Sequence, residues 1–164
     1  PVRAMVSGIP NVGKSTFINS FAGKACTRTG NKPGVTKGKQ WIRLNKGLEL
    51  LDTPGILWPK FEDQKVGERL AMIGTINDEI LQTEELAAAI IAYLQKAYAV
   101  LLSKRYNIDC DQDACQTLEK IALSRRCFQK GGAPDLLRAS QMLIDDFRSG
   151  RIGRITLEHP EEWQ

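Results

Sequence analysis

Residues that bind metals or form disulfides are scarce in this chain of 164 residues. It has one histidine, His159, and four cysteines, at positions 26, 110, 115 and 127, with no Cys-x-x-Cys pair. A zinc site needs about four Cys or His ligands at close spacing, so the pattern argues against one. We expect reduced and mostly packed thiols, as is usual in a cytosolic protein.

Long hydrophobic runs are absent as well. No segment approaches the ~18 consecutive apolar residues of a membrane span, so we expect no membrane partner. Residues 1–6 have neither an initiator methionine nor the layout of a signal peptide, and we expect the chain to begin inside a longer gene product. Hydrophobic residues make up 42% of the chain, which is enough to bury a core.

The net charge of +4 is unevenly distributed. Residues 1–65 hold 11 Lys and Arg against 4 Asp and Glu, whereas residues 66–164 hold 12 against 15. Within the second part, residues 120–154 carry 8 basic and 3 acidic side chains. Such basic zones suit a polyanionic partner, although the solvated face of a helix gives similar runs.

The hydrophobic pattern changes near residue 65. Before it, the pattern predicts a short buried strand, a helix and two further strands, at residues 2–7, 14–22, 41–44 and 48–51. After it, apolar residues recur at helical spacing to about residue 150. The sequence therefore predicts an α/β fold with about three strands over residues 1–65, followed by an all-helical domain over residues 66–164.

Residues 8–15 (GIPNVGKS) match the phosphate-binding pattern G-x-x-x-x-G-K-[ST] of a P-loop. The glycines let the backbone wrap phosphates closely, and successive N–H groups point inward at the helix N-terminus. We expect Lys14 to place its charge on the β- and γ-phosphates and the Ser15 hydroxyl to ligate Mg²⁺. An accidental glycine-rich turn is the alternative, which the flanking strand and helix disfavour. The predicted nucleotide-binding residues of this loop are Asn11, Val12, Gly13, Lys14, Ser15 and Thr16.

The segment Asp52–Gly55 (DTPG) comes directly after a predicted strand. We expect Asp52, at the strand end, to hold Mg²⁺ through water. The backbone N–H of Gly55 would contact a γ-phosphate, so that the following loop senses hydrolysis. Alone, DTPG is as often a plain turn, but its 37-residue separation from Ser15, with a strand hairpin between, favours the magnesium site.

A polar segment separates these two motifs. Residues 24–38 are rich in Gly, Thr and Lys and are expected to form a mobile loop. A threonine in such a loop supplies a second Mg²⁺ ligand when the loop closes on the γ-phosphate, and Thr36 is the candidate. A plain polar loop is the alternative. The catalytic candidates are then Lys14, Thr36 and Gly55, and the magnesium ligands are Ser15, Thr36 and Asp52.

Together these motifs resemble the circularly permuted ribosome biogenesis GTPase A (YlqF-type) family. The resemblance rests on residues 8–15, 33–36 (PGVT) and 50–60 (LLDTPGILWPK), and it runs on to residues 153–158 (GRITLE). It implies a cytoplasmic enzyme that binds GTP with Mg²⁺, hydrolyses it to GDP and phosphate, and assists maturation of the large ribosomal subunit. It also implies a partial P-loop GTPase sheet followed by an all-helical domain.

The chain lacks the Asn-Lys-x-Asp motif that reads guanine. In the permuted family this motif precedes the P-loop strand, so the chain resembles the C-terminal part of a longer protein. Its missing N-terminal segment would then be a partner that reads the base and completes the sheet. Guanine specificity is implied by the resemblance alone.

Ile56 follows Gly55, where many signalling GTPases have a water-orienting glutamine. An isoleucine side chain forms no hydrogen bond, so another group must assist hydrolysis. One candidate is K⁺ held by Asn11, because similar Asn-bearing P-loops use potassium where negative charge develops between the β- and γ-phosphates. A turn-forming role of Asn11 is the alternative. The missing segment and ribosomal RNA are other candidates, and hydrolysis would be slow until the correct partner binds.

Three functional hypotheses follow. The first is a GTPase switch for ribosome assembly, in which the basic region 120–154 contacts rRNA. The second is an RNA-binding module whose nucleotide site is inert. The third is a P-loop ATPase or kinase, which the spacing of Asp52–Gly55 disfavours.

Three expectations concern packing. Trp41 is expected in the core, and Trp58, beside Pro59, is a candidate for stacking on a partner. The first strand would be left with an unpaired edge, which is a liability for aggregation or strand exchange. We therefore expect another segment to supply strands, or else low stability of the chain alone.

Overall fold

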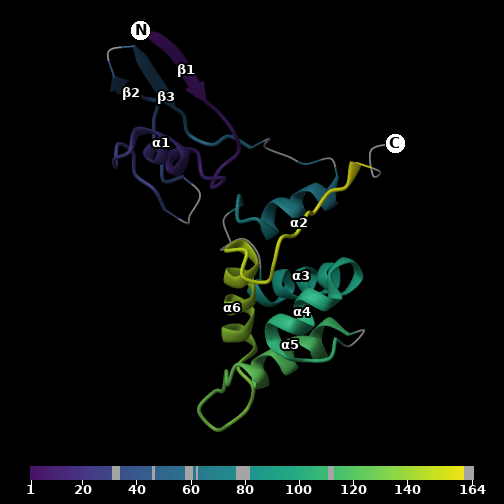
Figure 1. Ribbon diagram of the computed structural model, residues 1–164. Helices are drawn as coiled ribbons and strands as arrows, with labels where there is room; N and C mark the ends of the chain where they lie inside the picture. Colours follow the sequence, from purple (N-terminus) through teal and green to yellow (C-terminus); the bar gives the residue numbers. More distant parts are fainter. Residues whose placement is uncertain are drawn as a thin grey trace. The chain divides into compact units, whose positions relative to one another are not determined.

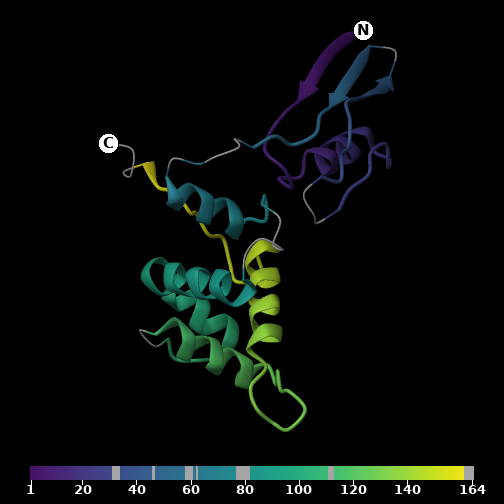
Figure 2. The same ribbon diagram turned by 180° about the vertical axis from the view of Figure 1, so that it is seen from behind.

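The computed structural model describes residues 1–30, 34–45, 47–57, 61, 63–76, 82–110 and 113–160. It divides into two compact units, Pro1–Asn77 and Asp78–Gln164, which Figures 1 and 2 show from two sides. The division falls after the boundary expected at residue 65, so that helix α2 (Gln64–Met72) belongs to the first unit. Trp58, Pro59 and Pro33 lie outside the described residues.

The first unit is built on a three-stranded sheet, as the sequence predicts. Its elements are β1 (Val2–Val6), α1 (Lys14–Ala22), β2 (Gln40–Asn45) and β3 (Leu48–Asp52). The strand order is β1-β3-β2, with β1 parallel and β2 antiparallel to the central β3 (Figure 1). Helix α1 packs on the sheet through Ile18, which is fully buried in a cluster with Ile42 and Leu50.

Two expectations about packing are wrong in this unit. The sequence predicts a buried first strand, but Met5 is 63% exposed. It also predicts Trp41 in the core, but Trp41 is 52% exposed. Successive side chains of a strand point to opposite faces, and the cluster around Ile42 and Leu50 forms on only one of them. Trp41 instead lies under the guanidinium of Arg3, 5.3 Å from its ring centroid. β1 is an edge strand of the sheet, as expected.

The second unit is helical throughout its described elements, which are α3 (Thr83–Ala97), α4 (Ala99–Tyr106), α5 (Ala114–Ser124) and α6 (Leu136–Arg148). Helix α3 contacts α4, α5 and α6, and α6 lies beside α3 and α5 in both views (Figures 1 and 2). Its core includes Ile90, Leu94 and Leu143, all at positions where the helical spacing predicts burial. Asp113 and Asp135 cap the N-termini of α5 and α6 through their carboxylates.

Among the described residues, no single helix is long and apolar enough to cross a bilayer. Helices α3 and α4 meet that length and composition only as a pair, and they are bent by 118° at their junction.

A buried carboxylate joins two helices of the second unit. Asp146 on α6 accepts a hydrogen bond from the Tyr106 hydroxyl at 3.0 Å and pairs with Arg105 of α4 at 2.8 Å and with Arg151 at 3.2 Å. Burial alone would raise the pKa of Asp146, but the hydrogen bonds from Arg105, Tyr106 and Arg151 together lower it below its ordinary value. The charged form of Asp146 therefore stabilises the packing of α4 against the end of α6.

Replacing Asp146 with asparagine should lower the free energy of unfolding by about 2–3 kcal/mol, because Arg105 loses its buried counter-charge. Since the pKa of Asp146 is lower in the folded state, its contribution should be complete above the unfolded pKa of about 4 and disappear as the pH falls further. Urea unfolding followed by far-UV circular dichroism measures both effects. Asp145→Asn, at the exposed neighbouring position, is the control. Equal stability of the two variants would contradict the assignment.

Candidate functional site

The P-loop joins β1 to α1 and turns sharply into the helix. Gly13 has a φ of 89°, in the left-handed region that side chains other than glycine rarely adopt. Helix α1 starts at Lys14, and its first turn has neither a capping side chain nor an acidic residue. The N–H groups at the start of α1 are therefore able to bind an anion.

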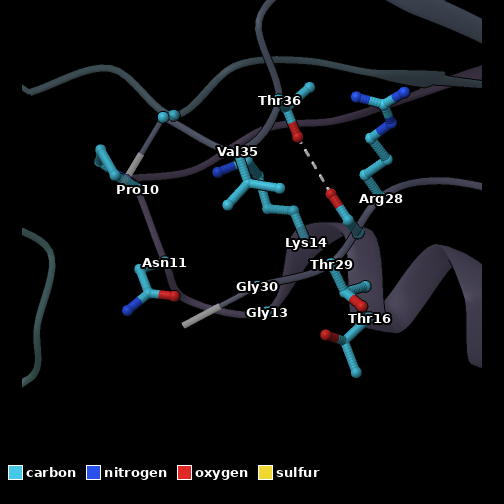
Figure 3. A pocket seen from close by; sticks show the side chains of 13 residues that line it. Pro10, Asn11, Gly13, Lys14, Thr16, Arg28, Thr29, Gly30, Val35 and Thr36 are labelled. Atoms are coloured by element: carbon cyan, nitrogen blue, oxygen red, sulfur yellow. Dashed lines mark hydrogen bonds between the residues drawn. The ribbon is translucent and has the colours of Figure 1, made fainter. Parts of the chain in front are cut away.

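A cavity of about 300 Å³ lies over this loop (Figure 3). It is lined by three segments that lie far apart in the sequence. They contribute Pro10, Asn11, Gly13, Lys14, Ser15 and Thr16; then Arg28, Thr29, Gly30, Gly34, Val35 and Thr36; and finally Gly55. Five of the six predicted P-loop residues thus line the cavity, and Val12 does not. An adjoining cavity of about 430 Å³ shares Arg28, Val35 and Thr36 and is also lined by Asp52.

The three predicted magnesium ligands meet at one point. The Ser15 hydroxyl lies 3.2 Å from the Thr36 hydroxyl, as the dashed line in Figure 3 marks, and donates to Oδ2 of Asp52 at 3.2 Å. Asp52 is only 1% exposed, and its other oxygen, Oδ1, is buried without a hydrogen-bond partner in the described part of the chain. A buried carboxylate oxygen without a partner is costly. This set of oxygen donors fits Mg²⁺ and its bound water.

Lys14 points its charge into the loop. Its Nζ donates to the carbonyl oxygen of Ile9 at 2.8 Å. Burial lowers the pKa of Lys14 from its ordinary value, and the negative charge of Asp52 opposes part of that shift. A bound phosphate could therefore replace the Ile9 carbonyl as the hydrogen-bond partner of the Lys14 ammonium group.

The segment after β3 lies directly on the P-loop. A Cβ atom added at Gly55 would be 2.4 Å from both N and Cα of Pro10 and 2.8 Å from the carbonyl carbon of Ile9. Such distances are far below van der Waals contact, so only glycine fits. The Thr53 hydroxyl donates to the Val6 carbonyl at 2.8 Å and holds the start of the segment to the end of β1.

Asn11 and Ile56 lie apart from the meeting point of the three predicted magnesium ligands. Asn11 lines the cavity, has a φ of 57° and donates from Nδ2 to the Gly74 carbonyl at 3.0 Å. The left-handed φ suits the turn-forming role, because asparagine tolerates that conformation. Ile56 is 76% exposed and does not line the cavity.

Two residues near the site, Arg28 and Asn19, could not be predicted from the sequence patterns. Arg28 lines both cavities, and Asn19 of α1 binds the backbone around Thr27. Neither cavity lining nor such a contact leaves a periodic pattern in the sequence. Asn19 does carry one signal, since asparagine is a poor residue for the interior of a helix.

Comparisons with known proteins give a consistent set of matches. Residues 3–121 match the family model described as 50S ribosome-binding GTPase. Curated relatives include Ribosome biogenesis GTPase A of Bacillus cereus, 45% identical over 163 residues, which cover 99% of this chain and 55% of the relative. Ribosome biogenesis GTPase A of Thermotoga maritima is 31% identical over 160 residues, which cover 98% of this chain and 57% of the relative. The chain therefore spans little more than half the length of these relatives.

Two solved structures are similar to the whole chain. GDP-bound TM YlqF matches with a TM-score of 0.64 and 28% identity, covering 98% of this chain and 61% of that one. GNP-bound YlqF from T. maritima matches with a TM-score of 0.63 and 29% identity, covering 98% and 60%. One of these structures is named for a bound nucleoside diphosphate, GDP.

Replacing Gly55 with alanine should weaken binding of a fluorescent GTP analogue by about tenfold or more, because the new methyl group must displace the P-loop backbone. Titration in the presence of Mg²⁺ measures the affinity, and circular dichroism checks that the variant is folded. Gly38→Ala is the matched control, since a Cβ there meets no atom within 4 Å. Unchanged affinity in the Gly55 variant would show that this contact does not shape the site.

Proposed function

The chain belongs to the 50S ribosome-binding GTPase family, and we propose that it binds GTP with Mg²⁺, hydrolyses it to GDP and phosphate, and so acts as a switch in assembly of the large ribosomal subunit. The observation that carries this proposal is the meeting of Ser15, Thr36 and Asp52 beside the P-loop cavity. The cytoplasm is the compartment we propose, as the family resemblance implies.

The triphosphate would lie against the N–H groups at the start of α1. Lys14 would exchange the Ile9 carbonyl for β- and γ-phosphate oxygens. Ser15 and Thr36 would ligate Mg²⁺, and Asp52 would hold its bound water through Oδ1, which lacks a partner in the described residues. Bound Mg²⁺ would neutralise charge on the phosphate oxygens.

A switch requires that the protein distinguish GTP from GDP. Thr36 and Gly55 come from different segments and line the same cavity, so a γ-phosphate would be contacted from both sides. Loss of that phosphate on hydrolysis would remove the shared ligand and release both segments. We propose that only the GTP state holds the conformation that binds the ribosome.

Exposed basic residues of the second unit support RNA as the partner. Six of the eight basic residues in 120–154 are exposed: Arg125, Arg126, Lys130, Arg138, Arg151 and Arg154. Several such residues neutralise phosphates together and make affinity depend strongly on salt. These basic residues also favour the second hypothesis, an RNA-binding module with an inert nucleotide site. Nucleotide-binding experiments distinguish that module from the GTPase switch.

Labelled GTP should bind the chain more tightly with Mg²⁺ than with a chelator, and Ser15→Ala should abolish that difference, because it removes a hydroxyl ligand. Equilibrium binding measures the affinity with Mg²⁺ and with the chelator. Competition by unlabelled ATP and GTP shows which nucleotide the site prefers. Magnesium-independent or absent binding would favour the RNA-binding module, whereas stronger competition by ATP would favour an ATPase.

Hydrolysis should be slow in the chain alone and should rise when large ribosomal subunits are added, because Ile56 cannot orient the attacking water. If Asn11 holds K⁺, the rate in potassium should exceed the rate in sodium. Asn11→Gly should remove that difference while preserving the left-handed turn. Release of phosphate measures each rate, and equal, negligible rates under all conditions would contradict the switch.

A further inference from the structure

Asn19 of α1 binds the chain where it leaves the helix. Its Oδ1 accepts hydrogen bonds from the backbone N–H groups of Cys26 and Thr27, both at 2.8 Å. Its Nδ2 donates to the carbonyl oxygen of Thr27 at 2.9 Å. Both ends of one side-chain amide therefore bind the backbone of two successive residues.

Thr27 extends this contact to the proposed magnesium site. Its hydroxyl lies 3.1 Å from the Ser15 carbonyl oxygen and 3.1 Å from Oδ1 of Asn19. The hydroxyl has one proton, so it donates to one of these two oxygens at a time. Ser15 and Asn19 are four residues apart, and so they share a face of α1. The residue whose side chain meets Thr36 and Asp52 is thus bound through its backbone to Thr27.

Apolar packing also holds Cys26 in place. The side chain of Cys26 packs against the cluster of Ile18, Ile42 and Leu50 that joins α1 to the sheet. Polar contacts from Asn19 and apolar contacts from this cluster therefore hold residues 26 and 27 together. We name this arrangement the Asn19 anchor, comprising Asn19, Cys26 and Thr27.

The Asn19 anchor shortens the segment that leads to Thr36. The helix ends at Ala22, fourteen residues before Thr36, whereas Thr27 is nine residues before it. Holding Thr36 at the Ser15 hydroxyl then constrains a shorter segment of chain, and the entropic cost of fixing the two ends of a segment falls with its length.

We propose that Asn19 is a positioning residue that fixes the start of the segment carrying Thr36, and thereby favours the GTP state over the GDP state. This inference rests on the proposed function, in which Thr36 acts when a γ-phosphate is present. Loss of the anchor should then weaken binding of a triphosphate and leave binding of a diphosphate nearly unchanged.

The test compares Asn19→Ala with the unchanged chain in binding a non-hydrolysable GTP analogue and GDP, each with Mg²⁺. We expect about a tenfold loss of affinity for the analogue and little change for GDP. Alanine is the better helix former, so α1 itself should persist. Ser20→Ala, at the exposed neighbouring position, is the matched control and should change neither affinity.

Two variants of Thr27 separate its hydroxyl from its shape. Thr27→Val removes the hydroxyl and should lower analogue affinity by a smaller factor, because the bonds from Asn19 to the backbone remain. Thr27→Ser keeps the hydroxyl and should bind the analogue as tightly as the unchanged chain does. Hydrogen exchange at the amides of Cys26 and Thr27 should accelerate in Asn19→Ala and not in Ser20→Ala, which reports the anchor directly.

The outcomes distinguish this inference from the proposed function. If the unchanged chain binds both nucleotides and Asn19→Ala lowers both affinities equally, or neither, the inference is overturned and the proposed function stands. If the unchanged chain binds neither nucleotide in a magnesium-dependent way, the proposed function fails and the inference with it. A selective loss of affinity for the GTP analogue, with faster hydrogen exchange at Cys26 and Thr27, supports both the proposed function and this inference.

Discussion

The parallel pairing of β1 with β3 determines the geometry of the first unit. In this register Val6 lies opposite Asp52, at the carboxyl ends of both strands. The chain leaves β1 into the P-loop and leaves β3 into the segment containing Gly55, so the two loops begin side by side. Ligand sites of open α/β sheets lie at such strand ends, and here the pairing helps to bring together motifs that are 37 residues apart.

The burial of Asp52 is the main energetic constraint at that edge. A carboxylate that is almost fully buried requires partners, and in the described residues it has only one, the hydroxyl of Ser15. Lys14 compensates at longer range, since the charge of Asp52 acts to raise the pKa of that lysine against the effect of burial. The arrangement is thus incomplete electrostatically, which is expected of a site that receives a cation and phosphates.

Much of this could be predicted from the sequence, and the two failures, at Trp41 and Asn19, have different physical origins. The P-loop, helix α1 and the position of Asp52 follow from local patterns of glycine, charge and hydrophobic spacing. The exposure of Trp41 is not predictable from the sequence, because alternation reveals that a strand has two faces but not which face is covered. The role of Asn19 is not predictable because a side-chain amide that binds the backbone seven and eight residues later leaves no periodic pattern, apart from an asparagine in an unfavourable helical position.

The contact between Gly55 and Pro10 has a mechanical consequence. Most neighbouring segments in a protein touch through side chains, which absorb small movements by adjusting their rotamers. Here backbone lies on backbone at a distance that would not admit one methyl group, so no intervening side chain can absorb a shift. A movement of either segment toward the other would therefore be transmitted directly from backbone to backbone.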